Sequence, residues 1–443
     1  MADVRSITAA DVMAVHRRLL AGEPGGSGLL AGEPGGSGLL GGEPGELALV
    51  DAREPADFTR GHLLYAANLP PSHVGLEAPS RIPRLSTPVV VCDAGGGEAA
   101  AVALELTVLG YTDTAVLDGG IDAWAATGGE LYSGINVPSK LFGELVEAHF
   151  RTPHVTADEL AAWLADGRDL VVLDSRTRRE FNRMSIPTGR SCPGGELVRR
   201  VQDLVDGSTM VVVNCAGRTR SIMGAQSLRS AGLANQVFAL KDGTMGWELA
   251  GLQLDHGRDD QAPEPSSAGR AQAAAAAHAV ARRCGVRTID SEQLEDWLCA
   301  GDVRTTYLMD VRTPQQYAHG HVPGAVCAPG GQLVQASDEY LVTRGSRVVL
   351  ADEDGIGATM SASWLIQMGW DAWVLEPGWL DSSELVSGGD EAAETARRSR
   401  QPALPYDPKD AEVAKAAMQA YLDWEVALPD QYAGDDLVEF RFL

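Results

Sequence analysis

Basic residues are scarce in this chain. Its 443 residues include 36 lysines and arginines against 61 aspartates and glutamates, which gives a formal net charge of −25 at pH 7. A surface of that sign repels phosphate backbones and anionic lipid headgroups, so we expect neither nucleic acid nor a membrane as a partner. No apolar run approaches the roughly 18 residues that a membrane-spanning helix needs. The N-terminal segment carries an acid at Asp3 and has no apolar core, which argues against a secretory signal and favours a cytoplasmic protein.

Cysteines are also few, and no two of them form a CxxC pair. The six stand at Cys92, Cys192, Cys215, Cys284, Cys299 and Cys327. Such scattered spacing argues against both a disulfide framework and a zinc site. We therefore expect free thiols, no metal and no cofactor.

One pattern occurs three times along the chain. An apolar run ends in Asp-x-Arg at Asp51, Asp174 and Asp310. About forty residues later, each unit has a second apolar run, a loop, a helix-like stretch that closes on glycine, and another short apolar run. Strands that alternate with helices in this way predict an α/β fold, in which each unit is a small parallel sheet covered by helices on both faces.

Three such units predict three domains. We place them at 4–130, 150–252 and 285–382. Residues 253–284 form a polar linker leading into an Ala-rich helix, and residues 383–443 form a C-terminal tail with a helix. The first unit is longer than the others because AGEPGGSGLL occurs twice within 21–44, which we interpret as a tandem duplication inserted in a surface loop.

The register of the units decides which of them has a nucleophile. Cys215 lies 41 residues after Asp174 and 17 before the closing glycine, Gly232. In the other two units the residue 17 before the closing glycine is Asp93 or Asp352, each 42 residues after the aspartate of Asp-x-Arg. Only the second unit therefore has a thiol at this position.

These features together resemble the rhodanese family. The Asp-x-Arg motif, a Gly-His turn at Gly61 and Gly320, a loop after a strand, and a closing Gly-Gly-x-x-x-Trp extend over about three hundred residues. The resemblance implies three rhodanese-like domains and one cysteine, at a strand end, that carries a persulfide. It also implies transfer of sulfane sulfur from a small-molecule donor such as thiosulfate or mercaptopyruvate to a thiophilic acceptor, such as a thiol or cyanide.

The loop CAGRTRS after the second unit's strand is the candidate site. Its residues are Cys215 as the catalytic nucleophile, with Ala216, Gly217, Arg218, Thr219, Arg220 and Ser221 as substrate-binding residues. Amides of a strand-to-helix loop converge on an anion and favour a thiolate, which predicts a lowered pKa for the cysteine. The two arginines suit a doubly charged donor, although either can instead face solvent or pair with an acid. We interpret Asp174 and Arg176 as structural support, an ion pair that braces the strand end.

In the two units without a thiol, an acid cannot form a persulfide and repels an anionic donor, so we interpret them as inactive companions. A non-catalytic binding or regulatory scaffold stays open as an alternative. A phosphatase is the other alternative, but it needs an arginine six residues after the cysteine, where this chain has Ser221. The cationic loop favours thiosulfate or a similar anionic donor. A homo-oligomer is left open as well.

Overall fold

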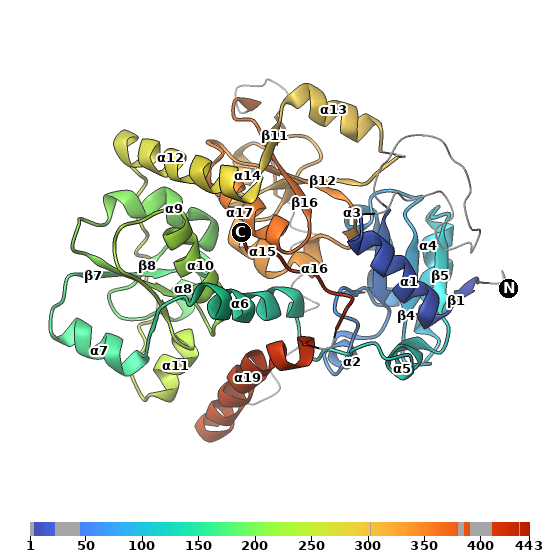
Figure 1. The fold of residues 1–443 in the computed structure, drawn as a ribbon, viewed down its shortest axis with the longest axis horizontal. Coiled ribbons are helices and arrows are strands. Elements are labelled where there is room, and N and C mark those ends of the chain that lie inside the picture. Colours follow the sequence, from blue (N-terminus) through green and yellow to red (C-terminus); the bar gives the residue numbers. More distant parts are fainter. Residues whose placement is uncertain (1–3, 23–44, 302, 380–384, 390–409, 434) are drawn as a thin grey trace.

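The computed structural model describes residues 4–22, 45–301, 303–379, 385–389, 410–433 and 435–443. These residues form three α/β domains, each built on its own small sheet (Figure 1). Most of the AGEPGGSGLL repeat, at 23–44, lies outside the described residues. Among the described residues, no helix is both long enough and apolar enough to cross a membrane.

The first sheet combines strands from two parts of the chain. They are β1 (Ser6–Ile7), β2 (Leu47–Asp51), β3 (Ala67–Asn68), β4 (Val89–Cys92), β5 (Thr114–Leu117) and β14 (Thr343–Arg344). The order is β1-β5-β4-β2-β14, and β3 also pairs with β2. All pairs are parallel except that of β14, which belongs to the third domain's part of the sequence and runs antiparallel to β2. The predicted parallel sheet is thus extended at one edge by a strand from elsewhere in the chain.

Helices cover both faces of this first sheet. They are α1 (Ala9–Leu20), α2 (Pro55–Phe58), α3 (Val74–Arg81), α4 (Glu98–Val108) and α5 (Gly120–Ala126), with a short 3-10 turn at Pro71–His73. Side chains alternate along a strand, so Leu49 of β2 packs in the cluster with α1 and α5, whereas Val50 packs in the cluster with α3 and α4.

The second and third sheets have the same strand arrangement, and all their pairs are parallel. The second runs β6 (His154–Val155), β10 (Val237–Leu240), β9 (Met210–Asn214), β7 (Leu170–Asp174) and β8 (Arg190–Ser191). The third runs β11 (Arg287–Ile289), β16 (Asp371–Leu375), β15 (Arg347–Ala351), β12 (Thr306–Asp310) and β13 (Val326–Cys327). This shared order is the structural form of the sequence repeat.

The second domain contains α7 (Ala157–Ala165), α8 (Arg178–Arg183), α9 (Leu197–Arg200), α10 (Thr219–Ser230) and α11 (Gly243–Leu249), with 3-10 turns at Gly194–Glu196 and Val201–Asp203. The third contains α13 (Ser291–Cys299), α14 (Pro314–His319), α15 (Gly330–Gln335), α16 (Ser337–Tyr340) and α17 (Ile356–Gln367). Local chemistry fixes where these helices begin. At α7, for example, the Thr156 hydroxyl accepts from the Glu159 N–H, and the Glu159 carboxylate accepts from the Thr156 N–H, which forms a capping box.

Three further helices join the domains. α6 (Val137–Phe150) follows the first domain and packs against α10, and α12 (Ser267–Cys284) packs between α9 and α17 (Figure 1). One large apolar cluster extends across the second and third domains. In the C-terminal part, α19 (Ala411–Tyr432) returns to the second domain and contacts α6 and α11. This return positions the C-terminal helix beside the loop that carries Cys215.

Candidate active site

The three domains have different residues at one structural position. In each sheet, the aspartate of Asp-x-Arg pairs in register with the last residue of the neighbouring strand, namely Asp51 with Cys92, Asp174 with Asn214 and Asp310 with Ala351. The next residue is Asp93, Cys215 or Asp352, respectively. Cys215 therefore lies at the carboxyl end of its strand, the edge at which parallel α/β sheets bind ligands.

The Cys215 loop is held in shape by α11. The thiol side chain is buried, and the loop connects β9 to α10. The Thr244 N–H donates to the Cys215 carbonyl at 2.9 Å, and the Met245 N–H donates to the Ala216 carbonyl at 3.0 Å. Gly243 has a φ of +54°, and a Cβ at this position would lie 2.4 Å from the Cys215 carbonyl oxygen. Glycine therefore allows α11 to approach the loop this closely.

A buried ion pair lies beneath the loop. Arg176 Nη2 is 2.7 Å from Asp174 Oδ2, and Asn214 Nδ2 donates to the same oxygen at 2.8 Å, which joins the ends of β7 and β9. Arg176 also donates to Thr244 Oγ1 at 3.5 Å. The ion pair thus lies between the strand ends, and a structural rather than a catalytic role for it stays a prediction.

The pKa of the Cys215 thiol is raised, whereas the sequence predicts that it is lowered. Burial is the main cause. The charge of Arg220 and hydrogen bonds from the Ser221 side chain and backbone N–H act in the opposite direction, while the Glu425 carboxylate raises the pKa further. The loop does supply groups that stabilise a thiolate, but burial beneath other parts of the chain outweighs them.

Arg220 is directed towards the third domain. Its guanidinium forms two contacts with the Glu180 carboxylate, at 2.8 and 3.0 Å, and donates to Gln332 Oε1 at 3.2 Å. Burial alone would raise the pKa of Glu180, but the Arg220 charge and hydrogen bonds lower it to about 2. Arg220 is thus fixed in place by an acid while its charge still acts on the thiol.

Arg218 is directed away from Arg220, towards α6. Its guanidinium pairs with Glu144 at 2.7 Å, with Glu147 at 2.5 Å and with Asp242 at 3.0 Å. Burial raises the pKa of Glu144 even though Arg218 opposes this effect. The sequence leaves open whether Arg218 faces the donor, faces solvent or pairs with an acid. In the structure its guanidinium pairs with acids. A direct contact with the donor stays a prediction.

The remaining loop residues face inward or towards α19. Ser221 is fully buried, and its hydroxyl donates to the Arg218 carbonyl at 2.7 Å. Thr219 Oγ1 donates to Glu425 Oε1 at 3.3 Å. A Cβ on Gly217 would lie 3.1 Å from Glu425 Oε2 and 3.3 Å from the Tyr421 ring. The C-terminal helix therefore covers the middle of the loop.

Comparison with known proteins identifies the repeated unit. Residues 40–127, 156–250 and 290–384 each match the family model described as Rhodanese-like domain. The chain belongs to the rhodanese family. The crystal structure of a thiosulfate sulfurtransferase from Pseudomonas aeruginosa is 37% identical in sequence with a TM-score of 0.85, over 99% of this chain and 100% of the other. A rhodanese-like domain from Anabaena sp. is 27% identical over 26% of this chain and 87% of its own, with a TM-score of only 0.23. The search of curated proteins found no match.

In the first and third rhodanese-like domains, an aspartate stands at the position of Cys215, and its carboxylate accepts hydrogen bonds from the backbone of the same loop. Asp93 accepts hydrogen bonds from the N–H groups of Gly95, Gly97 and Ala99 at 2.8 to 3.0 Å. Asp352 accepts in the same way from Gly355 and Ala358. Burial raises the pKa of Asp352 to about 7, and neighbouring acids add to this effect. The amides that would hold an anionic ligand are thus satisfied within the protein.

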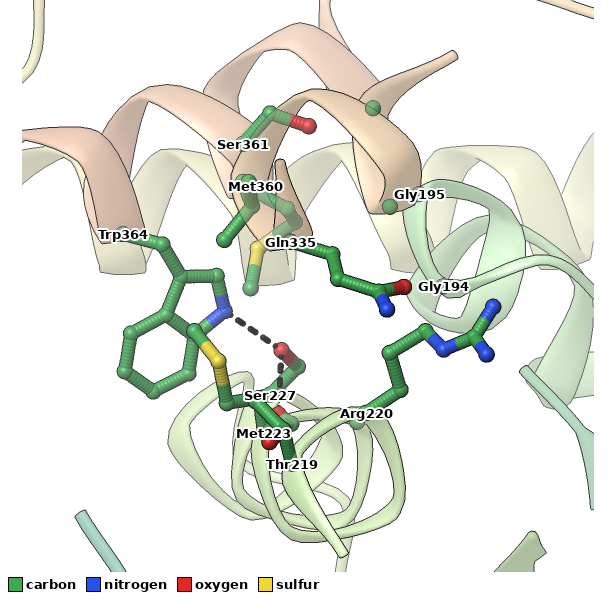
Figure 2. A pocket seen from close by; sticks show the side chains of 14 residues that line it. Gly194, Gly195, Thr219, Arg220, Met223, Ser227, Gln335, Met360, Ser361 and Trp364 are labelled. Atoms are coloured by element: carbon green, nitrogen blue, oxygen red, sulfur yellow. Dashed lines mark hydrogen bonds between the residues drawn. The ribbon is translucent and has the colours of Figure 1, made fainter. Parts of the chain in front are cut away.

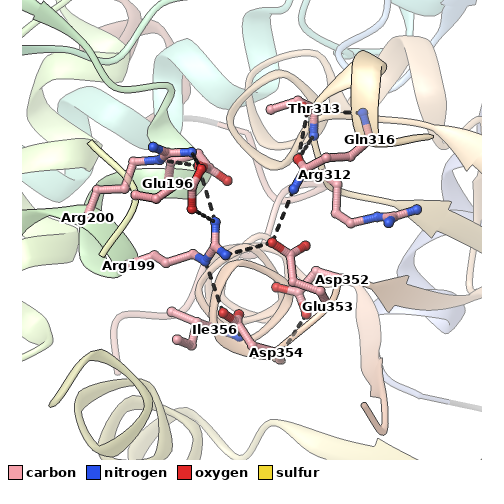
Figure 3. Close-up of polar contacts among 12 residues, drawn as sticks. Glu196, Arg199, Arg200, Arg312, Thr313, Gln316, Asp352, Glu353, Asp354 and Ile356 are labelled. Carbon is pink, nitrogen blue, oxygen red and sulfur yellow. Dashed lines mark hydrogen bonds and ion pairs between the residues drawn. The ribbon is translucent and has the colours of Figure 1, made fainter. Parts of the chain in front are cut away.

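The third domain's loop also pairs with the second domain. Arg199 of α9 lies 2.8 Å from the Glu353 carboxylate and 2.9 Å from that of Asp354, and its own side chain is buried (Figure 3). Asp352, Glu353 and Asp354 occupy the places of Cys215, Ala216 and Gly217. In this rhodanese-like domain, the loop thus forms an interdomain contact.

A cleft lies between the second and third domains, next to the Cys215 loop. Thr219 and Arg220 line it on one side, and Trp364 on the other donates through Nε1 to Ser227 Oγ at 2.8 Å (Figure 2). The cleft is lined mainly by apolar groups and glycines, with an arginine from the candidate site.

The sequence reasoning missed the residues that α6 and α19 bring to the loop. Glu144 and Lys140 come from a segment that carries no motif. The sequence did contain a signal that could have identified Glu425. It stands seven residues after Met418 and three after Leu422, on the same face of the helix as these apolar residues. An acid on the apolar face of an amphipathic helix indicates a buried polar contact.

Proposed function

We propose that this protein is a sulfurtransferase that carries sulfane sulfur as a persulfide on Cys215. Membership of the rhodanese family and the likeness to the Pseudomonas enzyme support sulfur transfer in general. The observation that carries the proposal is the position of Cys215, a thiol at the end of a β-strand in a loop whose Arg220 is held by Glu180 while its charge acts on the sulfur. The other two domains have an aspartate at this position.

The proposed reaction has two steps with thiosulfate, or a similar anion, as donor. The Cys215 thiolate attacks the outer sulfur of thiosulfate, the S–S bond of the donor breaks, and sulfite leaves with the electron pair. A thiophilic acceptor then attacks the outer sulfur of the Cys215 persulfide, and the thiolate leaves. Arg220 favours the thiolate before the first step and after the second, because its charge opposes the effect of burial on the thiol.

Intact mass measurement tests this proposal. After treatment with thiosulfate and removal of excess donor, we expect the protein to gain the mass of one sulfur atom, located on the peptide that contains Cys215. Addition of cyanide or a thiol should remove it. If the protein gains no sulfur under these conditions, the result would instead favour the alternative of a non-catalytic binding scaffold.

The first and third domains are proposed to be inactive companions of the second. We expect Asp93→Cys or Asp352→Cys, each in a Cys215→Ser background, to restore less than about a hundredth of the wild-type rate, because neither loop positions an arginine as Arg220 is positioned. Turnover of thiosulfate is the measurement. Robust turnover by either variant would contradict the proposed inactive role, since it would show that the loop had kept its ability to bind the donor.

A further inference from the structure

Glu425 is a buried acid with one carboxylate oxygen that has no hydrogen-bond partner among the described residues. Its exposed fraction is 1%, although it comes from the C-terminal helix rather than from a rhodanese-like domain. Oε1 accepts from the Tyr421 hydroxyl at 2.9 Å and from Thr219 Oγ1 at 3.3 Å, whereas Oε2 accepts no hydrogen bond from the described residues. An unsatisfied buried carboxylate oxygen destabilises a fold, so its presence points to a ligand that donates to it.

The free oxygen faces the candidate active site. Oε2 is the atom nearest to where a Cβ of Gly217 would lie, at 3.1 Å, and Gly217 is two residues from Cys215. The carboxylate is also close enough for its charge to act on the thiol. A donor group that meets Oε2 would therefore lie beside the loop that carries the reactive sulfur.

No charged neighbour neutralises this carboxylate through an ion pair in the described part of the chain. One cation near it is Lys140 of α6, whose Nζ donates to the Ile135 carbonyl at 2.7 Å and lies over the Tyr421 and Trp424 rings. Burial lowers the pKa of Lys140 to about 8, and Glu425 opposes this effect. The other charged groups around Glu425 are Glu144 of α6 and Arg220 of α10, which are held by Arg218 and Glu180, respectively.

We propose that Glu425 accepts the proton of a thiol acceptor, so that the C-terminal helix makes the Cys215 site a persulfide-to-thiol transferase; this inference rests on the proposed function. The acceptor's S–H gives its proton to Oε2 while its sulfur attacks the outer sulfur of the Cys215 persulfide. A new S–S bond forms on the acceptor, the bond to Sγ breaks, and its electron pair leaves on Cys215 as thiolate. The proton then passes from Glu425 to the outer sulfur of the product.

A base is useful here because an ordinary thiol has a pKa of about 8.5 and is mostly protonated at neutral pH, whereas only the thiolate attacks. Glu425 lies close to the cleft between the second and third domains, since Thr219 both lines this cleft and donates to the Glu425 carboxylate.

The test separates the two half-reactions in the full-length chain. Wild type, Glu425→Gln and Glu425→Asp are loaded with thiosulfate and then unloaded either by dithiothreitol, which must lose a proton, or by sulfite, which at pH 8 has none to lose. Asp423→Asn is the matched control, because it removes one charge from an exposed position of the same helix. The rate at which the persulfide mass disappears is the readout.

We expect Glu425→Gln to load at least as fast as the wild type, because an anionic donor no longer meets a negative charge. Its unloading by dithiothreitol should slow by about 10²- to 10⁴-fold, the usual contribution of a general base, while unloading by sulfite is unchanged or faster. The defect should shrink as the pH rises above the pKa of the acceptor thiol. Glu425→Asp should give an intermediate rate, and Asp423→Asn should behave as the wild type.

Equal slowing with both acceptors, or no change with either, overturns the role of Glu425 as proton acceptor. A Glu425→Gln protein that does not load while Glu425→Asp loads normally assigns the residue a structural role and also overturns it. A wild-type protein that takes up no sulfur is a different result, since it overturns the proposed function together with this inference.

Discussion

Cys215→Ser is expected to reduce sulfur transfer from thiosulfate to background, a loss of about four orders of magnitude or more. A serine hydroxyl cannot form the persulfide, and no described thiol occupies the corresponding position in the first or third domain. Turnover with cyanide and the mass of the thiosulfate-treated variant are the two measurements. The mass should stay unchanged in the variant.

Cys92→Ser and Cys192→Ser are the controls for this substitution. Both thiols are buried like that of Cys215, but neither stands at its loop position, since Cys92 is the last residue of β4 and Cys192 follows β8. We expect both variants to keep most of the activity. Substantial turnover by Cys215→Ser, or loss of sulfur uptake in a control that remains folded, would exclude Cys215 as the single carrier.

Gly243→Ala should lower the rate of sulfur loading by about a hundredfold, although residue 243 has no side chain to touch a substrate. A methyl group there would lie 2.4 Å from the Cys215 carbonyl oxygen and 2.7 Å from that of Gly217. Because both neighbours are backbone atoms, the loop or α11 must move, and the N–H groups around the thiol move with it. The positive φ adds about 1–2 kcal/mol of strain.

Gly232→Ala separates the two effects. Gly232 has a φ of +82°, and a Cβ there would meet nothing within 4 Å, so this variant carries the backbone strain without the collision. In thermal unfolding, Gly232→Ala should lose the roughly 1–2 kcal/mol of stability that the positive φ costs. Its rate of sulfur loading should equal that of the wild type. If the two variants load sulfur equally well, the contact between α11 and the loop is not what holds the site in shape.

The repeated pattern and its register were predictable from the sequence because they depend on short segments. An apolar run ending in Asp-x-Arg predicts β2, β7 and β12, and equal spacing aligns Asp93, Cys215 and Asp352 without any three-dimensional information. Strand pairing then places the three residues at equivalent positions. The reason is that each unit folds mainly through contacts within about one hundred residues of chain.

The surroundings of Cys215 depend instead on contacts between distant segments. Thr219 and Glu425 are separated by 206 residues, and β14 joins β2 across nearly 300 positions of sequence. A strand-to-helix loop predicts a lowered pKa for the Cys215 thiol, yet burial outweighs the charge of Arg220 and raises it, and Arg218 pairs with acids of α6. Local pattern thus specifies which residue is the candidate nucleophile. Its burial, its charged neighbours and the acid that covers it arise from packing of helices that no local motif connects to the loop.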